Sequence, residues 1–320
     1  MTDPSMNAAR IHAFGSPDVI VIDDVARPAP GSHELLIRVT AAGVGPWDAL
    51  IRAGKTEIKP PFPFILGSEF AGTVEQVGDA VSSFRIGDRV YGATNPQFIG
   101  GYTEFAVASA EMSALAPQSL SDLEAASAPV VAVTAWQMVH EYGEATPGQT
   151  VLINGGAGNV GAYAVQLARG AGLHVIATAS AGDADFVRSL GADEVLDYKG
   201  VDFTDAASSV DIVLDTVGGE TRVRSAQVVK PGGILVSVVT PFPAERMIPG
   251  VRTAFFFVEV TTARLTTLTS LFERGELKPH VGSVLPLAEA RLAHEMLAGV
   301  PHARGKIVLS VGEPASDAKR

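Results

Sequence analysis

The sequence predicts an α/β protein that combines a doubly wound parallel sheet with a β-rich segment forming a small barrel. Three observations support this fold class. A glycine-rich turn at 156–161 stands between an apolar strand and a helix, strand and helix patterns alternate after it, and residues 6–125 read as short strands separated by Gly and Pro. A chain of 320 residues leaves room for two domains.

The β-rich segment is predicted from short apolar runs interrupted by turn residues. Pro and Gly at 28–31 and the prolines at 59–64 break the pattern, because both residue types favour turns over regular strands. A turn followed by a short helix is expected at 41–54. The expected strands are 20–22, 34–40, 65–78 with a glycine kink, 87–91 and 101–107.

The pattern changes at Ser121, which is predicted to cap a helix because Glu124 follows three residues later, as in a capping box. We expect a helix over most of 125–142 despite Pro129. Strands and helices then alternate, which is typical of a doubly wound parallel sheet. The expected strands are 151–153, 174–179, 194–198, 211–215, 233–239 and 253–258, with helices at 184–190 and 220–229.

The last 60 or so residues add a second mixed region. We expect a helix over 262–274, a strand at 281–285, a helix at 287–298 and a strand at 306–311. The polar residues 313–320 are expected to be frayed.

The glycine turn has the chemistry of a phosphate site. Glycine permits a tight turn, lets a pyrophosphate approach the backbone, and lets the helix pack closely on the strand. The N–H groups and dipole at the helix start favour an anion. The turn therefore predicts dinucleotide binding, and the alternative is a glycine-rich turn used only for packing. The turn residues are Gly156, Ala157, Gly158, Asn159, Val160 and Gly161.

Composition excludes several functional classes. The net charge of −11 disfavours nucleic acid and anionic membranes as partners. No cysteine is present, so disulfides, thiol catalysis and cysteine-ligated metal centres are excluded, and the seven histidines lack metal-ligand spacing. We find neither an apolar stretch of about 18 residues nor a signal peptide, and we expect a cytoplasmic protein.

Motifs along nearly the whole chain resemble one family. They are Gly67-Ser68-Glu69-Phe70-Ala71-Gly72, Gly87-Asp88-Arg89-Val90, Thr134-Ala135-Trp136, the glycine turn, Leu190-Gly191-Ala192-Asp193, Asp215-Thr216-Val217-Gly218 and His302-Ala303-Arg304-Gly305-Lys306. In this order they resemble the medium-chain dehydrogenase/reductase superfamily, and within it the zinc-independent quinone oxidoreductases, which are zeta-crystallin-like.

The resemblance implies a domain arrangement. A GroES-like catalytic domain would be built from 1–124 and 261–320, and a Rossmann nucleotide-binding domain, 125–260, would be inserted between them. The active site would lie in the cleft between the two domains, at the carboxyl ends of the parallel strands.

The resemblance also implies chemistry without a metal. Zinc-dependent relatives carry Gly-His-Glu where this chain has Gly67-Ser68-Glu69, and a ligating cysteine within the stretch that here runs from Gly43 to Asp48. A zinc site of that kind would lack its thiolate and imidazole ligands. The implied reaction is hydride transfer from a reduced nicotinamide to a quinone or an α,β-unsaturated carbonyl, whose conjugation spreads the developing charge onto oxygen.

The cofactor prediction depends on Ser180, at the end of the second parallel strand. NAD enzymes usually place Asp or Glu there, and an acid would repel a 2′-phosphate to which a serine hydroxyl can donate. This favours NADP(H), although Ser180 could instead be an ordinary helix N-cap. Basic residues that relatives often supply nearby are replaced by Gly182 and Ala184, and Tyr198, followed by Lys199, matches a position that reaches the adenosine phosphate.

Four further cofactor contacts follow by matching family positions. Thr134 is expected near the nicotinamide, and Val217 and Val238 follow the fourth and fifth strands, where the nicotinamide ribose and ring are held. Lys306 could reach a cofactor phosphate or ribose, and its alternative is a solvated lysine at a strand end.

The acceptor pocket departs from the family pattern of Asn-Pro-x-Asp followed two residues later by Tyr. Gly45 replaces the Asn and Leu50 the Tyr, which removes two polar groups, while Trp47 adds a large apolar wall. The candidate catalytic residues are Trp47, Asp48 and Arg52. We expect an ion pair with Arg52 to keep Asp48 ionised, so that Asp48 fixes the loop and solvent delivers the proton, and the alternative is that Asp48 transfers a proton.

The sequence thus predicts an NADP(H)-dependent reductase of quinones or α,β-unsaturated carbonyls. Two alternatives remain open: a reductase of enoyl thioesters, and a non-catalytic nucleotide-binding sensor or structural protein. The apolar segment Thr253–Val258 is expected at the edge of the parallel sheet, where it could pair with a second copy to form a homodimer.

Overall fold

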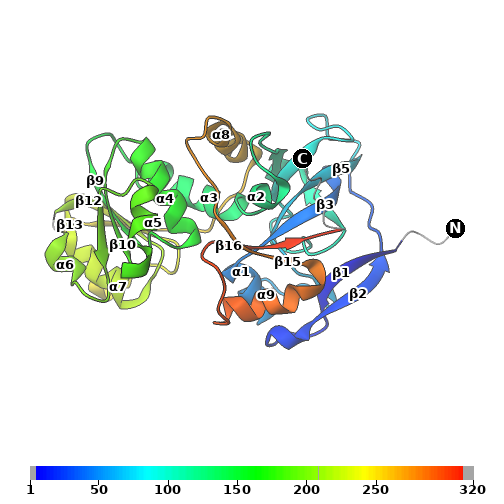
Figure 1. Ribbon diagram of the computed structural model, residues 1–320, viewed down its shortest axis with the longest axis horizontal. Helices are drawn as coiled ribbons and strands as arrows, with labels where there is room; N and C mark the ends of the chain where they lie inside the picture. Colours follow the sequence, from blue (N-terminus) through cyan, green and yellow to red (C-terminus); the bar gives the residue numbers. More distant parts are fainter. Residues whose placement is uncertain (1–4, 208, 313–320) are drawn as a thin grey trace. The chain divides into compact units, whose positions relative to one another are not determined.

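The computed structural model describes residues 5–207 and 209–312, and the tail predicted to be frayed, 313–320, lies outside them. The chain forms two compact units (Figure 1). Within the described residues, the first unit comprises 5–130, 260–274 and 279–312, and the second comprises 131–207, 209–259 and 275–278. The two ends of the chain, blue and red in Figure 1, therefore build the same unit.

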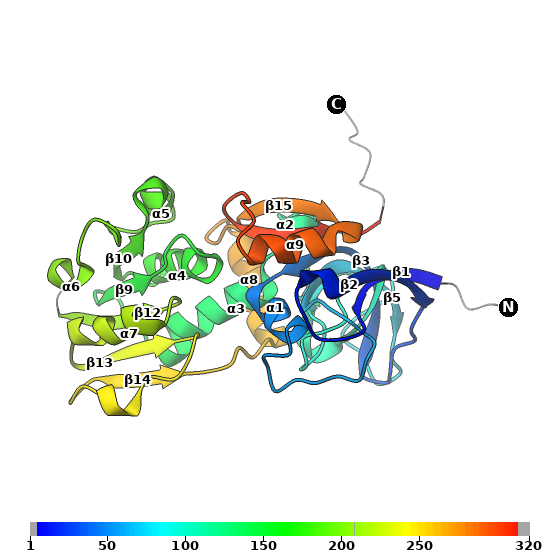
Figure 2. The same ribbon diagram turned by 90° about the horizontal axis from the view of Figure 1, so that it is seen from below.

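The second unit contains a six-stranded sheet in which every neighbouring pair is parallel, as predicted. The strand order is β11-β10-β9-β12-β13-β14, and β10 to β14 can be followed in this order in Figure 2. The chain first moves outward from β9 and then returns to its other side, so the switch point of the sheet lies at β9. The strands are β9 (Thr150–Asn154), β10 (His174–Ala179), β11 (Glu194–Asp197), β12 (Val210–Asp215), β13 (Val229–Ser237) and β14 (Arg252–Phe255).

Helices precede the first of these strands and alternate with the strands that follow. The helix expected over 125–142 is divided, and Pro129 begins a helix instead of interrupting one. Proline is tolerated there because the first helical N–H has no partner within the helix. The elements are α3 (Pro129–Trp136), the π-helical η3 (Gln137–Tyr142), α4 (Asn159–Gly170), η4 (Ala181–Asp183), α5 (Ala184–Ser189), α6 (Phe203–Ala206), α7 (Gly219–Ser225), η5 (Ala226–Val228) and η6 (Ala244–Arg246).

The sixth strand is at the sheet edge, as expected, but it is shorter than predicted. It ends at Phe255 and not at Val258. The last pair of its ladder joins Ser237 to Phe255, and Ser237 is the final residue of β13. Beyond that pair β13 has ended, so the parallel ladder between β13 and β14 stops at Phe255.

The first unit contains two sheets. One has the order β2-β1-β4, and the other has the order β15-β16-β3-β5-β6-β8 with β7 also paired to β3. Both contribute to one buried core, because Ile11 of β1 packs in the same cluster as Leu35, Phe70 and Leu309. The strands are β1 (Ser5–Ile11), β2 (Ile20–Ala26), β3 (Glu34–Val44), β4 (Phe64–Ile65), β5 (Glu69–Val77), β6 (Arg89–Ala93), β7 (Phe105–Ser109), β8 (Ser113–Leu115), β15 (Val281–Pro286) and β16 (Lys306–Ser310).

The helical parts of this unit include the predicted capping box. The Ser121 hydroxyl accepts from the N–H of Glu124, and the Glu124 carboxylate accepts from the N–H of Ser121 at 2.9 Å. Both ends of the box are thus satisfied. The elements are η1 (Pro17–Val19), α1 (Pro46–Arg52), η2 (Ala110–Met112), α2 (Asp122–Ala126), α8 (Thr262–Glu273), η7 (Leu287–Glu289) and α9 (Ala290–Leu297).

The single kinked strand expected at 65–78 is wrong, since the segment forms two strands in different sheets. Between them Gly67 has φ +100°, and a Cβ there would lie 2.2 Å from the ring of Tyr102. The sharp turn therefore requires glycine. The preceding strand also differs from its prediction, because β3 continues to Val44 before α1 begins.

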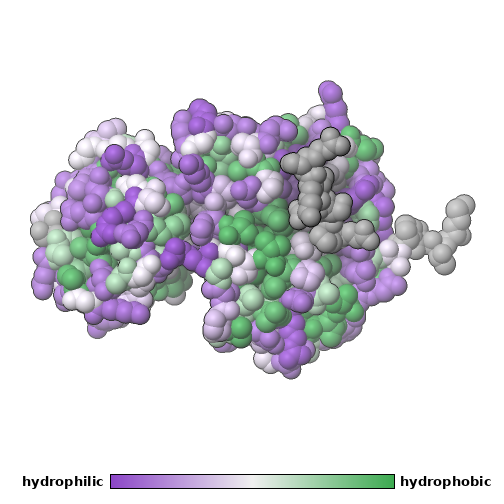
Figure 3. Space-filling model, viewed as in Figure 1, coloured by the Kyte–Doolittle hydropathy of each residue, from purple (hydrophilic) through white to green (hydrophobic). Residues whose placement is uncertain are grey.

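None of the helices in the described part of the chain has the length and apolar character needed to cross a membrane. On the face drawn in Figure 3, the broadest hydrophobic area lies on the first unit.

Candidate functional site

The glycine turn is built as the sequence predicts, between β9 and α4. The N–H of Gly155 donates to the hydroxyl of Thr178 at 3.0 Å, and the N–H of Gly156 donates to the carbonyl oxygen of Thr178 at 2.9 Å. These bonds fix the turn to the end of β10. Gly158 is the N-cap of α4 and has no side chain to cap it, so the first-turn N–H groups are left for a ligand.

Two glycines of the turn are required by close packing. A Cβ at Gly161 would lie 2.1 Å from the carbonyl oxygen of Gly155, and a Cβ at Gly156 would lie 2.9 Å from the Cβ of Ala177. Real Cβ atoms do not approach other atoms so closely. These residues bring α4 against the sheet, which leaves contact with a ligand to their neighbours.

A cavity of about 540 Å³ opens beside the turn, entirely within the second unit. Five of the predicted cofactor residues line it: Ala157, Gly158, Ser180, Tyr198 and Val217. The other lining residues were not predicted, and they are Gly155, Thr178, Ala179, Asp183, Val201, Phe203, Thr221 and Arg224.

Ser180 lies at the cavity, but its hydroxyl has a partner. It donates to the carboxylate of Asp183 at 2.6 Å. The cavity is therefore lined by an acid three residues beyond the expected position, and by a cation, Arg224, that comes from α7. Tyr198, with 56% of its surface exposed, also lines the cavity. No local pattern near Ser180 could have identified Arg224, because Arg224 lies on α7 and is distant from Ser180 in sequence.

The remaining predicted cofactor residues lie outside the cavity lining. Thr134 is buried on α3, and Val238 follows β13, with its N–H donating to the carbonyl oxygen of Asp215 at 3.3 Å. Asn159 and Val160 form the first turn of α4. Lys306 belongs to the first unit.

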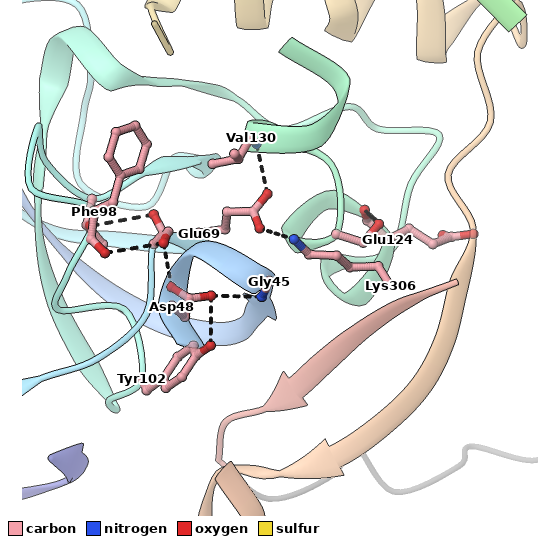
Figure 4. Close-up of polar contacts among 11 residues, drawn as sticks. Gly45, Asp48, Glu69, Phe98, Tyr102, Glu124, Val130 and Lys306 are labelled. Carbon is pink, nitrogen blue, oxygen red and sulfur yellow. Dashed lines mark hydrogen bonds and ion pairs between the residues drawn. The ribbon is translucent and has the colours of Figure 1, made fainter. Parts of the chain in front are cut away.

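A buried polar cluster in the first unit surrounds Asp48 (Figure 4). Its carboxylate accepts hydrogen bonds from the N–H of Gly45 at 2.8 Å, the hydroxyl of Tyr102 at 3.1 Å and the hydroxyl of Ser68. Asp48 is the third residue of α1, so its bond to Gly45 closes the N-terminal turn of that helix. The cluster thus fixes the loop between β3 and α1.

The expected ion pair between Asp48 and Arg52 is wrong. Arg52 donates instead to the carbonyl oxygen of Gly15 at 3.1 Å and to Nδ1 of His294 at 3.2 Å. Burial raises the pKa of Asp48 to about 6, although the bond from Ser68, the charge of Lys306 and the bond from Gly45 each act to lower it. Burial and the nearby carboxylate of Asp48 raise the pKa of Tyr102 well above its usual value.

Lys306 is neither solvated nor at an exposed strand end. It is 3% exposed, and its Nζ forms an ion pair with the carboxylate of Glu69. The other oxygen of Glu69 accepts from the N–H of Val130 at 2.8 Å, as Figure 4 shows. A Cβ at Gly45 would lie 3.3 Å from Nζ of Lys306, so this ammonium also occupies the space beside the Asp48 loop.

Trp47 is half-buried and packs against the core of the first unit, while Leu50 is 40% exposed. The structure thus brings Asp48 together with Ser68 and Tyr102, two contacts that sequence reasoning missed. Position 68 drew attention only as the place where zinc-dependent relatives carry histidine.

Comparison with known proteins places these features in a family. Residues 31–118 match the family model described as an alcohol dehydrogenase GroES-like domain, and residues 190–309 match the model described as a zinc-binding dehydrogenase. The quinone oxidoreductase of Mus musculus is 32% identical over 324 residues, which cover 95% of this chain and 97% of that protein.

Two further proteins are similar over most of their length. The 2-methylene-furan-3-one reductase of Solanum lycopersicum is 36% identical over 281 residues, covering 83% of this chain and 69% of that protein. The solved structure of mycobacterial Rv1454c complexed with NADPH has a TM-score of 0.85 and 31% identity, covering 96% of this chain and all of the other. With its GroES-like unit and its parallel nucleotide-binding sheet, the chain belongs to the medium-chain dehydrogenase/reductase superfamily, among the homologues of the quinone oxidoreductases.

Proposed function

We propose that this protein is an NADP(H)-dependent oxidoreductase that reduces a quinone or an α,β-unsaturated carbonyl without a metal ion. The observation that carries the proposal is the cavity at the glycine turn, lined by the cradle residues together with Ser180 and Tyr198. The similarity to quinone oxidoreductases, to a furanone reductase and to a protein complexed with NADPH supports the same reading.

The turn residues fit a dinucleotide. Gly161 has no room for a Cβ, and Gly158 leaves the N-terminus of α4 uncapped by a side chain, so the backbone of Ala157 and Gly158 and the first turn of α4 would hold the pyrophosphate. Val217 would bound the site on the side of β12. When bound, the reduced nicotinamide supplies the hydride.

The donor set of the first unit does not fit the zinc of related dehydrogenases. Such a site needs thiolate and imidazole ligands. The chain has no cysteine, and the position of the imidazole is taken by Ser68, whose hydroxyl donates to Asp48. Nearby, the Nζ of Lys306 supplies a buried positive charge that is already paired with Glu69. We therefore assign no step to a metal.

Asp48 acts in this proposal by positioning. With a pKa of about 6 it is mostly ionised at neutral pH, and as a carboxylate it accepts from all three of its donors. It fixes the start of α1, the helix that carries Trp47, and the indole of Trp47 would form an apolar wall for the acceptor. The proton comes from solvent, so catalysis consists mainly of holding the two reactants in register.

The test is consumption of reduced cofactor, followed by its absorbance, with NADPH and NADH each offered against quinones, enones and an enoyl-CoA. We expect turnover of quinones or enones with NADPH, and weaker turnover with NADH. A clear preference for the enoyl-CoA would establish the thioester reductase instead. Tight NADPH binding with no turnover of any acceptor would leave the protein as a nucleotide-binding sensor or structural protein and reject the proposal.

A further inference from the structure

The positive charge in the lining of the nucleotide cavity does not come from the segment after Ser180, where the sequence suggests a cation. Of the described residues that line it, Asp183 carries a negative charge and Arg224 a positive one. Lys199, which directly follows Tyr198, is not among the lining residues, and its ammonium lies 5.8 Å from the centre of the Tyr198 ring. Among the described residues that line the cavity, the positive charge is therefore supplied by α7.

The end of β10 is poorly suited to hold a phosphate by itself. The hydroxyl of Ser180 already donates to Asp183 at 2.6 Å. A phosphate that took this hydroxyl would have to displace a carboxylate and would then lie beside it. Because like charges repel strongly when partly removed from water, this edge of the cavity needs a compensating cation.

Arg224 is held in place by α6. Its guanidinium bonds through Nη2 to the carboxylate of Asp202 and lies 5.0 Å from the centre of the Phe203 ring. Asp202 is itself fixed as the N-cap of α6, since it accepts from the N–H and the hydroxyl of Thr204 at 2.9 and 2.6 Å. A guanidinium carries five N–H donors in a planar fork, and the bond to Asp202 through Nη2 does not use them all.

We propose that Arg224, positioned by Asp202 and Phe203, recognises the 2′-phosphate of NADP(H) and gives this protein its cofactor preference. The inference rests on the proposed function only in assuming that the cavity binds the adenosine end of the dinucleotide. A planar fork suits a phosphate because it offers two parallel hydrogen bonds as well as charge. Preference for NADP(H) is then set by Arg224 of α7, whose positive charge offsets that of Asp183 in the lining of the same cavity.

The test measures binding and not turnover. The affinities of 2′,5′-ADP and of 5′-AMP are measured by calorimetry for the wild type and for Arg224→Gln, Arg224→Lys and Arg188→Gln. These two ligands share the adenosine and differ in the 2′-phosphate. Arg188 is a matched control, because it is an exposed arginine of α5 that is also paired with a carboxylate, Asp185, but it does not line the cavity.

We expect Arg224→Gln to weaken 2′,5′-ADP by tenfold or more, in line with loss of a charge-assisted contact to phosphate, and to leave 5′-AMP within about twofold. Arg224→Lys should fall between it and the wild type, and Arg188→Gln should match the wild type. Retained binding of 5′-AMP also shows that the variant is folded.

Three outcomes would overturn the assignment: an equal loss of both ligands in Arg224→Gln, no loss of either, or a wild type that binds 2′,5′-ADP no better than 5′-AMP. The proposed function can fail separately. If the wild type discriminates between the two ligands through Arg224 but reduces no acceptor, the reductase proposal is rejected and the role of Arg224 stands.

Discussion

Two buried residues of the first unit have pKa values that depart from the ordinary in opposite directions. Burial raises the pKa of Asp48 to about 6. Burial also lowers the pKa of His294 to about 3, and the charge of Arg52 adds to this effect. In both cases the neutral form is favoured in the folded protein, so each group links stability to pH with its own sign.

For Asp48, the folded protein binds its proton more tightly than the unfolded chain, in which the carboxyl titrates near 3.8. The contribution to stability is therefore fully present below pH 3.8 and is lost as pH rises to about 6. The loss is roughly 3 kcal/mol, at about 1.4 kcal/mol per pH unit. Asp48→Asn cannot ionise and should not lose this stability as pH rises. The free energy of unfolding of Asp48→Asn, relative to that of the wild type, should therefore increase from the acidic to the neutral end of this window.

Urea denaturation at the two ends of the window measures this difference. Asp185→Asn is the control, because the Asp185 side chain is fully exposed and the same charge is removed. A difference between Asp48→Asn and the wild type that does not change with pH would contradict the prediction.

For His294, the sign is reversed. The unfolded ring takes up a proton near pH 6.5, whereas the folded ring stays neutral until about pH 3. Its contribution to stability is present above pH 6.5 and is lost as pH falls through this range. His294→Gln, whose side-chain oxygen could accept from Arg52 as Nδ1 does now, should lose less stability than the wild type on acidification. Thermal unfolding at mildly acidic and neutral pH checks this, and a parallel decline in both proteins would refute it.

At the scale of the element, helix α4 contains a glycine that packing requires and another that it does not. A Cβ at Gly161 would lie 2.1 Å from the carbonyl oxygen of Gly155, whereas a Cβ at Gly170, at the end of the same helix, would meet nothing within 4 Å. The two positions therefore separate the packing role of glycine from its low helix propensity.

We expect Gly161→Ala to destabilise the second unit by about 2 kcal/mol or more and to weaken nucleotide binding, because α4 must move away from β9. Gly170→Ala should instead raise stability by up to ~1 kcal/mol through helix propensity, with nucleotide affinity unchanged. Calorimetric unfolding and cofactor titration distinguish the two. Similar effects from both substitutions would show that the close approach at Gly161 is not needed.

At the scale of the whole molecule, the parallel sheet ends at β14, an edge strand whose outer backbone groups are available for pairing. Phe257 follows it and is 69% exposed. We expect a homodimer in solution, formed by pairing of these edges. Light scattering should give twice the mass of the chain, and Phe257→Glu should shift the protein toward the monomer because it places a charge in the interface.

Ile86→Glu is the control for this experiment. Ile86 is 72% exposed, but it belongs to the first unit and is distant from β14 in sequence. It should leave the mass unchanged. A wild type that is monomeric at micromolar concentration would contradict the prediction of a homodimer.

Features that depend on neighbours along the chain could be predicted from the sequence alone. The glycine turn, the capping box at Ser121 and the parallel strands of the second unit were all predicted, because dihedral preferences, cap chemistry and apolar runs act over a few residues. Where prediction of the fold failed, the cause lay outside the segment. The last strand ends at Phe255 because its neighbour ends at Ser237.

The contacts between side chains depend on how distant elements pack. Asp48 and Arg52 belong to the same short helix, α1, but they have different partners. Asp48 accepts from the N–H of Gly45, whereas Arg52 donates to His294, which lies on α9. Lys306 of β16 pairs with Glu69 of β5 across the intervening strand β3, and Arg224 of α7 lines the cavity beside the glycine turn. The partners of buried charges are determined by the packing of distant elements and by the free-energy cost of leaving a charge unpaired. Neither can be predicted from the residues nearby in sequence.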